Sequence, residues 1–246
     1  MKGFVFFDVD NTIYDGYVTS DFYIFLADIG VFSSHIYEEE RDIVKAFQDG
    51  KINYAESGHR AIELTAKYLK GQTLAMLAIY QKKFLQTKVH LFPWVKKVFK
   101  LFRKAGFEPV LVSAAAEPAV SPIANKLGVS ICYTSKVFSK DGIFTGEYGK
   151  IINHEEKRKV VLHHTKSYPN ILKIGFGDSE GDLAMLMVMD KAFLYCPRNA
   201  ALIRQAEQNG FFIVNEDSIY NTIEQLLSKM SGIWLAKKEL AHPTLL

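Results

Sequence analysis

The sequence has few cysteines and no long apolar run, and each absence narrows the kind of protein it encodes. Only two of the 246 residues are cysteine, Cys132 and Cys196, and no CxxC motif occurs. This argues against a disulfide framework or a cysteine-rich metal site, and we expect two reduced thiols. No apolar stretch reaches the roughly 20 residues that a membrane-spanning helix needs. We therefore expect no membrane partner.

The sequence also lacks a large excess of either positive or negative charge. The 30 lysines and arginines nearly balance the 27 aspartates and glutamates, for a net charge of +3. Because the basic residues are scattered, apart from Lys157-Arg158-Lys159, the sequence does not favour a nucleic-acid partner. A signal peptide does not fit at the N-terminus, where an apolar run leads directly to Asp8. We expect a cytoplasmic protein, either a monomer or a homodimer.

Short apolar runs alternate with helical segments from about residue 90 onward. The runs, together with one at the N-terminus, are residues 3–7, 109–112, 130–133, 171–176, 192–195 and 211–214. The helices expected among them are residues 93–105, 118–127, 155–165, 182–189 and 200–208. Continuous apolar runs are typical of strands buried on both faces, and the alternation predicts right-handed βαβ units in a doubly wound parallel sheet. Ligands bind at the carboxyl ends of the strands in such sheets.

One long segment breaks this alternation. Residues 17–88 contain four helical patterns, at 20–29, 34–49, 54–69 and 73–87, with glycines between them. The sequence therefore predicts an α/β core made of residues 1–16 and 89–230, an inserted α-helical cap at 17–88, and a C-terminal tail at 231–246. Residues 137–148 predict a hairpin that turns at Asp141-Gly142.

Two carboxylates follow the first apolar run, in the segment Asp8-Val9-Asp10-Asn11-Thr12. Residues two apart along a strand point the same way, so Asp8 and Asp10 can reach one site. Such a pair suits a nucleophile and a general acid/base, with a divalent cation between the charges. A turn at a strand end would use the same residue types. The segments further along the chain favour the catalytic interpretation.

Ser113 follows the second strand-like run and precedes a helical segment. A hydroxyl and the amide of the next residue, Ala114, can hold a phosphoryl oxygen at such a junction, helped by the helix N-terminus. A simple helix cap is the alternative.

Phosphoryl transfer also needs a fixed cation that balances the phosphate and the nucleophilic carboxylate. The segment His154-Glu155-Glu156-Lys157-Arg158-Lys159 lies where this cation is expected. Spacing to the following apolar residues favours Lys157, with Lys159 as the second choice and Lys150 as a poorer fit. A solvated basic helix face is the alternative.

The segment Gly177-Asp178-Ser179-Glu180-Gly181-Asp182 directly follows the apolar run at residues 171–176. Its glycines allow a tight loop near a charged ligand. Asp178, at the strand end, is placed to bind a hard cation through oxygen, as Mg²⁺ prefers. Asp182, one helical turn further on, can support the water shell of that cation or orient the lysine.

The order of these four segments resembles the haloacid dehalogenase-like hydrolases, and within them the phosphoserine-phosphatase-like subgroup with a helical cap. The similarity covers residues 3–16 and about 90–227. It implies that Asp8 forms an aspartyl-phosphate and that Asp10 protonates the leaving oxygen and then activates water. It also implies that Mg²⁺ is bound by Asp8, the main-chain carbonyl of Asp10 and Asp178, with Asp182 in support. An aspartate at the position of Asp10 is the pattern of the phosphatases in the family.

The sequence therefore predicts a Mg²⁺-dependent phosphomonoester hydrolase that acts on a small phosphorylated metabolite, phosphoserine-like or another phospho-alcohol. Two alternatives stay open: a phosphotransferase that passes the phosphoryl group to an acceptor alcohol, and a non-catalytic protein that binds phosphate esters. The substrate is also open, because no segment of the helical insert maps onto a phosphoserine-binding set. The loop after Thr12 reads Ile13-Tyr14-Asp15-Gly16, without the glutamate usual in phosphoserine phosphatases.

Overall fold

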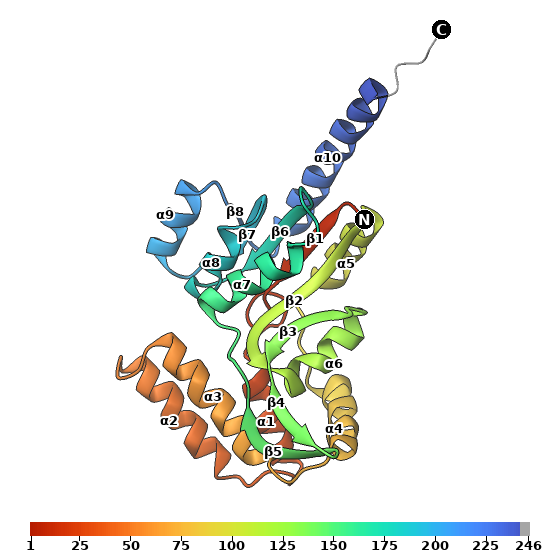
Figure 1. Cartoon of the computed structure of the whole chain (residues 1–246). Coiled ribbons are helices and arrows are strands. Elements are labelled where there is room, and N and C mark those ends of the chain that lie inside the picture. The colour runs from red at the N-terminus through yellow and green to blue at the C-terminus, as the bar shows by residue number, and fades with distance from the viewer. Residues whose placement is uncertain (242–246) are drawn as a thin grey trace.

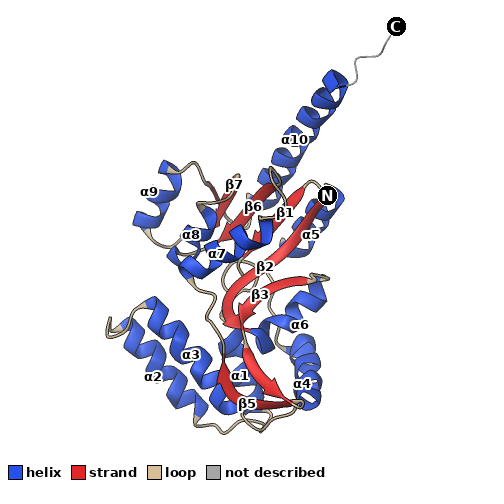
Figure 2. Ribbon diagram, in the orientation of Figure 1, coloured by secondary structure: helices blue, strands red, loops and turns tan. Residues whose placement is uncertain are grey.

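A six-stranded parallel sheet forms the centre of the protein (Figure 2). The structure, a computed structural model, describes the backbone of residues 1–241 and the side chains of residues 1–53 and 55–230. In spatial order the strands are β3 (Ile131–Ser135), β2 (Phe107–Ala116), β1 (Gly3–Phe7), β6 (Leu172–Gly177), β7 (Lys191–Tyr195) and β8 (Phe212–Val214). The predicted doubly wound parallel sheet is confirmed.

Helices cover both faces of this sheet (Figure 1). One face packs against α5 (Val95–Lys104), α6 (Glu117–Leu127) and α10 (Ile219–Ala241). The other packs against α7 (His154–Thr165), α8 (Leu183–Leu186) and α9 (Ala200–Gln208). Alternate side chains of β1 pack on opposite faces of the sheet: Val5 and Phe7 on the face covered by α5, α6 and α10, and Phe4 and Phe6 on the other. Every residue of β1 is buried, as expected for a strand covered on both sides.

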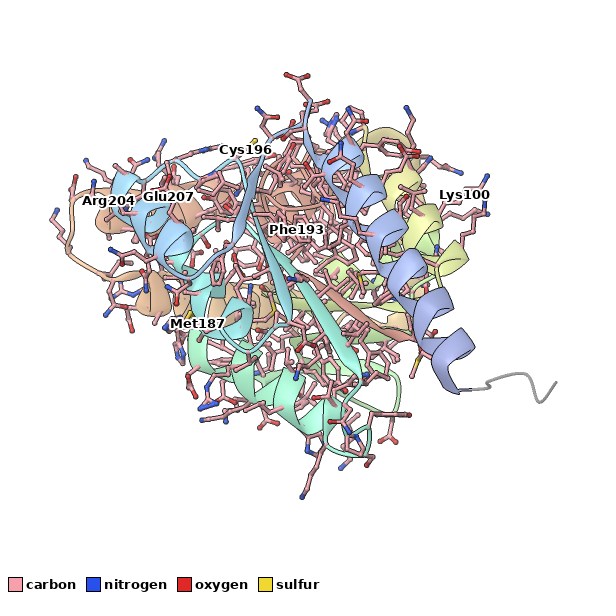
Figure 3. All side chains as sticks on the ribbon, turned by 90° about the horizontal axis from the view of Figure 1, so that it is seen from above. Lys100, Met187, Phe193, Cys196, Arg204 and Glu207 are labelled. Carbon is pink, nitrogen blue, oxygen red and sulfur yellow. The ribbon has the colours of Figure 1, made fainter. Side chains whose placement is uncertain are left out.

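A row of stacked phenylalanines crosses four neighbouring strands. Phe7, Phe176, Phe193 and Phe212 stand opposite one another in register, with ring centroids 4.6, 4.5 and 4.8 Å apart. Seen from above, Phe193 lies inside the molecule, whereas Lys100 of α5 and Arg204 of α9 lie at its edges (Figure 3). Since cross-strand aromatic pairs stabilise one register, the row fixes where β1 and β6 end relative to each other.

Four helices lie between β1 and α5 in the chain and form a separate layer beyond one end of the sheet (Figure 1). They are α1 (Val18–Asp28), α2 (Ile36–Gln48), α3 (Tyr54–Leu69) and α4 (Leu74–Thr87). They match the four helical patterns expected within residues 17–88. The division of the chain into a core and a cap at these boundaries stays a prediction.

A hairpin formed by β4 (Val137–Lys140) and β5 (Ile143–Tyr148) joins the inserted helices. It turns at Asp141 and Gly142, whose φ angles of 52° and 79° suit a tight hairpin turn. The amide of Gly71, in the loop between α3 and α4, donates to the Phe144 carbonyl at 2.9 Å, and the amide of Leu74, the first residue of α4, donates to the Gly142 carbonyl at 2.9 Å. The sequence predicts the hairpin but groups it with the core. Its hydrogen bonds to Gly71 and Leu74 connect it to the helical insert, and its assignment to the core stays a prediction.

Three elements differ from the sequence prediction. β2 continues to Ala116 rather than ending at residue 112. The helix expected at 182–189 is a 3₁₀ turn, Glu180–Asp182, followed by the four-residue α8. Helix α10 is not predicted at all, and it runs without a break through residue 231, where the tail is expected to begin. The rest of that tail, residues 242–246, lies outside the described residues.

Within the described part of the chain, none of the helices combines the length and the apolar character needed to cross a bilayer. The cytoplasmic location and the oligomeric state stay predictions.

Candidate active site

The predicted site residues gather at the carboxyl edge of the sheet. Asp8 directly follows β1 and Asp178 directly follows β6, its neighbour. The Asp8 amide donates to the Phe176 carbonyl at 3.0 Å, which continues the pairing of the two strands to their ends. Register and strand order therefore bring two carboxylates together that are 170 positions apart in the sequence.

Lys157 links Asp8 to Asp182. Its ammonium Nζ lies 2.5 Å from Asp8 Oδ1 and 2.7 Å from Asp182 Oδ1, and all three side chains are buried. Lys157 lies in the first turn of α7, which packs on the 3₁₀ turn that carries Asp182. The alternatives Lys159 and Lys150 have side chains 57% and 65% exposed, and both pair with Glu156. The structure thus places Lys157, and neither of these two lysines, at the cluster.

The loop after β6 is built around the Asp182 carboxylate. Its Oδ2 accepts hydrogen bonds from the amides of Asp178 and Ser179 at 3.1 and 3.2 Å, while its Oδ1 accepts from Lys157. This leaves no room for a side chain at Gly177, where a Cβ would lie 2.4 Å from the Asp182 Cβ. The glycine therefore allows the close approach that aims Asp182 at the lysine.

Thr12 takes part in the cluster although the sequence assigns it no role. Its hydroxyl lies 3.2 Å from Asp8 Oδ2 and 3.3 Å from Asp178 Oδ1, and the residue is fully buried. The chain turns back at Asn11, whose φ of 54° is a left-handed value that asparagine tolerates. The amide of Thr12 then donates to the Val9 carbonyl at 3.2 Å. The four-residue spacing from Asp8 is the signal that could have identified Thr12.

Ser113 and Ala114 lie within β2, next to β1, rather than after its end as the sequence predicts. The pairing of β2 with β3 shifts register between Val112 and Ala116, so this part of the strand is irregular. Ser113 Oγ accepts from the Ala115 amide at 3.1 Å, and the Ser135 hydroxyl donates to the Ala114 carbonyl at 2.7 Å. These hydrogen bonds hold the irregular segment in the strand and explain why β2 is longer than predicted.

The carboxylate of Asp10 contacts the helical insert. Its Oδ1 accepts from the amide of Val18, the first residue of α1, at 2.8 Å. Burial and then the charge of Asp8 raise the pKa of Asp10 from its ordinary value of 3.8 to about 7. A carboxyl group with a pKa near neutrality can both donate and accept a proton at physiological pH.

Three carboxylates here are suited to hold a metal ion. One oxygen each from Asp8, Asp178 and Asp182 lie within 4.8 Å of one another. Burial and the charge of Asp182 raise the pKa of Asp8 to about 6 and that of Asp178 to about 9. The shifts mean that one lysine does not compensate three carboxylates. A hard divalent cation with oxygen ligands fits both the donor set and the uncompensated charge.

A profile of the haloacid dehalogenase-like hydrolase family matches residues 5–187. The chain belongs to this family. The match begins within β1, ends one residue after α8 and so includes every predicted site residue. It confirms the resemblance seen in the motif order and the prediction of an enzyme of this family.

Relatives of this haloacid dehalogenase-like hydrolase include named phosphatases. The phosphoserine phosphatase of Methanocaldococcus jannaschii is 21% identical over 80% of this chain and 87% of that protein. The histidinol-phosphatase of Neisseria meningitidis is 22% identical over 87% of this chain and 99% of that protein. A solved structure of a phosphoserine phosphatase with an analogue of its phospho-aspartyl intermediate shares the fold, with a TM-score of 0.61 and 20% identity over 87% of this chain and 93% of the other.

Proposed function

We propose that the protein is a Mg²⁺-dependent phosphomonoester hydrolase that acts through an aspartyl-phosphate on a small phosphorylated alcohol. The observation that carries this proposal is the buried Lys157 ammonium between Asp8 and Asp182, beside Asp178. A fixed cation next to a nucleophilic carboxylate and a divalent-metal site is the arrangement that phosphoryl transfer requires.

In the first half-reaction Asp8 attacks phosphorus and the bond from phosphorus to the alcohol oxygen breaks. The Asp10 carboxyl gives its proton to that oxygen, and the alcohol leaves. The Ser113 hydroxyl proton is not used in the hydrogen bond from the Ala115 amide, so Ser113 can donate to a phosphoryl oxygen together with the Ala114 amide. Lys157 balances the charge of Asp8 and of the phosphoryl group.

In the second half-reaction water attacks the phosphorus of the aspartyl-phosphate. Asp10, now ionised, takes a proton from this water, the bond from phosphorus to the Asp8 oxygen breaks, and inorganic phosphate leaves. Asp8, the main-chain carbonyl of Asp10 and Asp178 would hold Mg²⁺, with Asp182 in support. When bound, Mg²⁺ would supply positive charge next to the phosphoryl oxygens.

The test is a panel of phosphate esters that begins with phosphoserine and histidinol phosphate, the compounds named by two relatives. It extends to phosphorylated sugars, nucleotides and simple phospho-alcohols. We expect free phosphate from at least one ester in Mg²⁺ and none in EDTA. More phosphorylated acceptor than free phosphate in excess alcohol would indicate a phosphotransferase. No turnover of any ester would contradict the proposal.

A second prediction concerns stability and the metal. The folded pKa values of Asp8, Asp10 and Asp178 all lie above their ordinary value of 3.8, at about 6, 7 and 9. Such groups contribute stability below the unfolded pKa, and this contribution is lost as the pH rises through the folded pKa. We therefore expect the metal-free protein to lose thermal stability between about pH 4 and pH 9 through these groups.

Mg²⁺ should offset this loss, because it binds the ionised carboxylates and competes with protons. The measurement is the thermal midpoint in EDTA and in Mg²⁺ at about pH 5.5 and about pH 8.5. The increase caused by Mg²⁺ should be larger at the higher pH and should disappear in Asp178→Asn. An increase that is equal at both pH values, or that persists in this variant, would contradict the assignment of the metal ligands.

A further inference from the structure

The chain passes between the sheet and the helical insert twice, once in the loop between Asp8 and α1 and again in the segment between α4 and α5. Hydrogen bonds join these two segments. The Asp15 amide donates to the His90 carbonyl at 2.8 Å, and the Phe92 amide donates to the Ile13 carbonyl at 3.2 Å. Tyr14 also forms an isolated β-bridge with Leu91. The loop that carries Asp10 therefore contacts both the start of α1 and the segment after α4.

Tyr14 is the side chain at the centre of this junction. It is fully buried, and its hydroxyl donates to Asp21 Oδ2 at 2.7 Å. The same hydroxyl lies 3.5 Å from the carbonyl oxygen of Lys88, the residue after α4. Burial and then the hydrogen bond to Asp21 raise the pKa of Tyr14, so the hydroxyl keeps its proton and remains the donor.

The hydrogen bond from Tyr14 acts on the helical turn that holds Asp10. Asp21 lies in the first turn of α1, and Val18 is the first residue of that helix. The Val18 amide is the donor to Asp10 Oδ1. Tyr14 thus holds the first turn of α1 against the loop that carries Asp10. The Val18 amide in that turn orients the Asp10 carboxylate.

We infer that Tyr14, through its hydrogen bond to Asp21, is a positioning residue for the general acid/base of the reaction. This inference rests on the proposed function, in which the Asp10 carboxyl protonates the leaving oxygen. Tyr14 touches neither the substrate nor the reacting atoms in this scheme. It keeps the first turn of α1 in place, and that turn keeps Asp10 directed at the oxygen that leaves phosphorus.

The effect of losing this hydrogen bond on the reaction rate should depend on the leaving group of the ester. An alkyl alcohol is a poor leaving group and needs its proton from Asp10 as the bond to phosphorus breaks. An aryl alcohol such as p-nitrophenol leaves as a stable anion and needs the acid far less. General acid catalysis contributes about 10²–10⁴-fold. Loss of its orientation should therefore slow alkyl esters much more than aryl esters.

The experiment compares kcat/KM for p-nitrophenyl phosphate with that for the best alkyl phosphate of the panel. In Tyr14→Phe and in Asp21→Ala, each of which removes one partner of this hydrogen bond, we expect the aryl-to-alkyl ratio to rise about tenfold or more, part of the range for a general acid. The double variant should show no larger ratio than either single variant, because both changes remove one hydrogen bond. The control is Tyr17→Phe, at a tyrosine of the same segment that is 61% exposed, and it should keep the wild-type ratio.

Asp10→Asn separates this inference from the proposed function. If Asp10 is the acid, this variant raises the ratio more than Tyr14→Phe does. A raised ratio in Asp10→Asn with a wild-type ratio in Tyr14→Phe would overturn the role of Tyr14 and leave the proposed function intact. Equal losses on both esters in Tyr14→Phe, with a lower thermal midpoint, would show a purely structural role and also overturn the inference. No turnover by the wild type would instead count against the proposed function.

Discussion

We expect Asp8→Asn to lower phosphatase turnover by about 10³-fold or more, because in the proposed mechanism an amide at this position cannot form the aspartyl-phosphate. A loss of that size corresponds to about 4 kcal/mol of transition-state stabilisation. Asparagine has nearly the shape of aspartate: its oxygen can accept from Lys157, and its amide group can donate to the Thr12 hydroxyl oxygen. The variant therefore removes the proposed nucleophile and leaves the surrounding contacts largely in place.

The same variant should not unfold the protein. Burial and the charge of Asp182 raise the pKa of Asp8 to about 6, so above that pH Asp8 is ionised in the metal-free fold at a cost in stability relative to the unfolded chain. A neutral amide removes this cost. At about pH 8 in EDTA we expect the thermal midpoint of Asp8→Asn to be equal to or above that of the wild type.

The measurement combines turnover with detection of the intermediate. Wild-type protein quenched in acid during turnover should carry a phosphoryl group on the peptide that contains Asp8, and Asp8→Asn should carry none. Asp15→Asn is the matched control, since Asp15 is an exposed carboxylate in the same loop. Substantial turnover by Asp8→Asn, or a phosphopeptide elsewhere in the chain, would refute the assignment of the nucleophile.

The sequence predicts the sheet well because buried parallel strands read as continuous apolar runs. Residues 3–7 match β1 at both ends, and the other five runs each find their strand within a few residues. Because such strands end at one edge of the sheet, the positions of Asp8 and Asp178 follow from their places at two strand ends. The choice of Lys157 over Lys159 follows from helical spacing, since one side of α7 faces the cluster and the other faces solvent.

What the sequence does not predict depends on contacts between distant segments. The hairpin at 137–148 is predicted correctly as a hairpin, but the sequence does not predict its backbone hydrogen bonds to Gly71 and Leu74 of the helical insert. The length of β2 depends on Ser135, whose hydroxyl donates to the Ala114 carbonyl. Likewise, Tyr14 looks like an ordinary apolar position in the sequence. The fold brings Asp21 within hydrogen-bond distance of its hydroxyl, and the sequence does not predict this contact.

Lys157→Met should cost both stability and activity. The change leaves Asp8, Asp178 and Asp182 buried or half-buried together without the ammonium that bridges two of them. Removing one partner of a buried ion pair typically destabilises a protein by about 3–5 kcal/mol. We expect a loss of this size in metal-free unfolding at about pH 8. Turnover should fall by about 10²-fold or more, since fixed charges of this kind act directly on the transition state.

Lys159→Met is the matched control, two residues further along the same helix. The Lys159 side chain is 57% exposed and pairs with Glu156 at 2.7 Å. Exposed pairs of this type contribute about 0–1 kcal/mol. We expect nearly wild-type turnover and a change in unfolding free energy of at most about 0.5 kcal/mol. A larger loss of turnover in Lys159→Met than in Lys157→Met would show that Lys157 is not the catalytic cation.

The dependence of Lys157→Met on pH and Mg²⁺ tests whether charge, rather than lost packing, causes its effect. Without the ammonium, the three carboxylates repel one another most when all are ionised. Protonation relieves this repulsion, so the stability difference from the wild type should shrink as the pH falls from about 8 toward about 5. Mg²⁺ supplies positive charge to the same carboxylates and should restore part of the thermal midpoint. It should not restore turnover, because a cation held by Asp178 does not replace an ammonium fixed between Asp8 and Asp182. A stability loss that is independent of both pH and Mg²⁺ would mean that Lys157 acts by filling space.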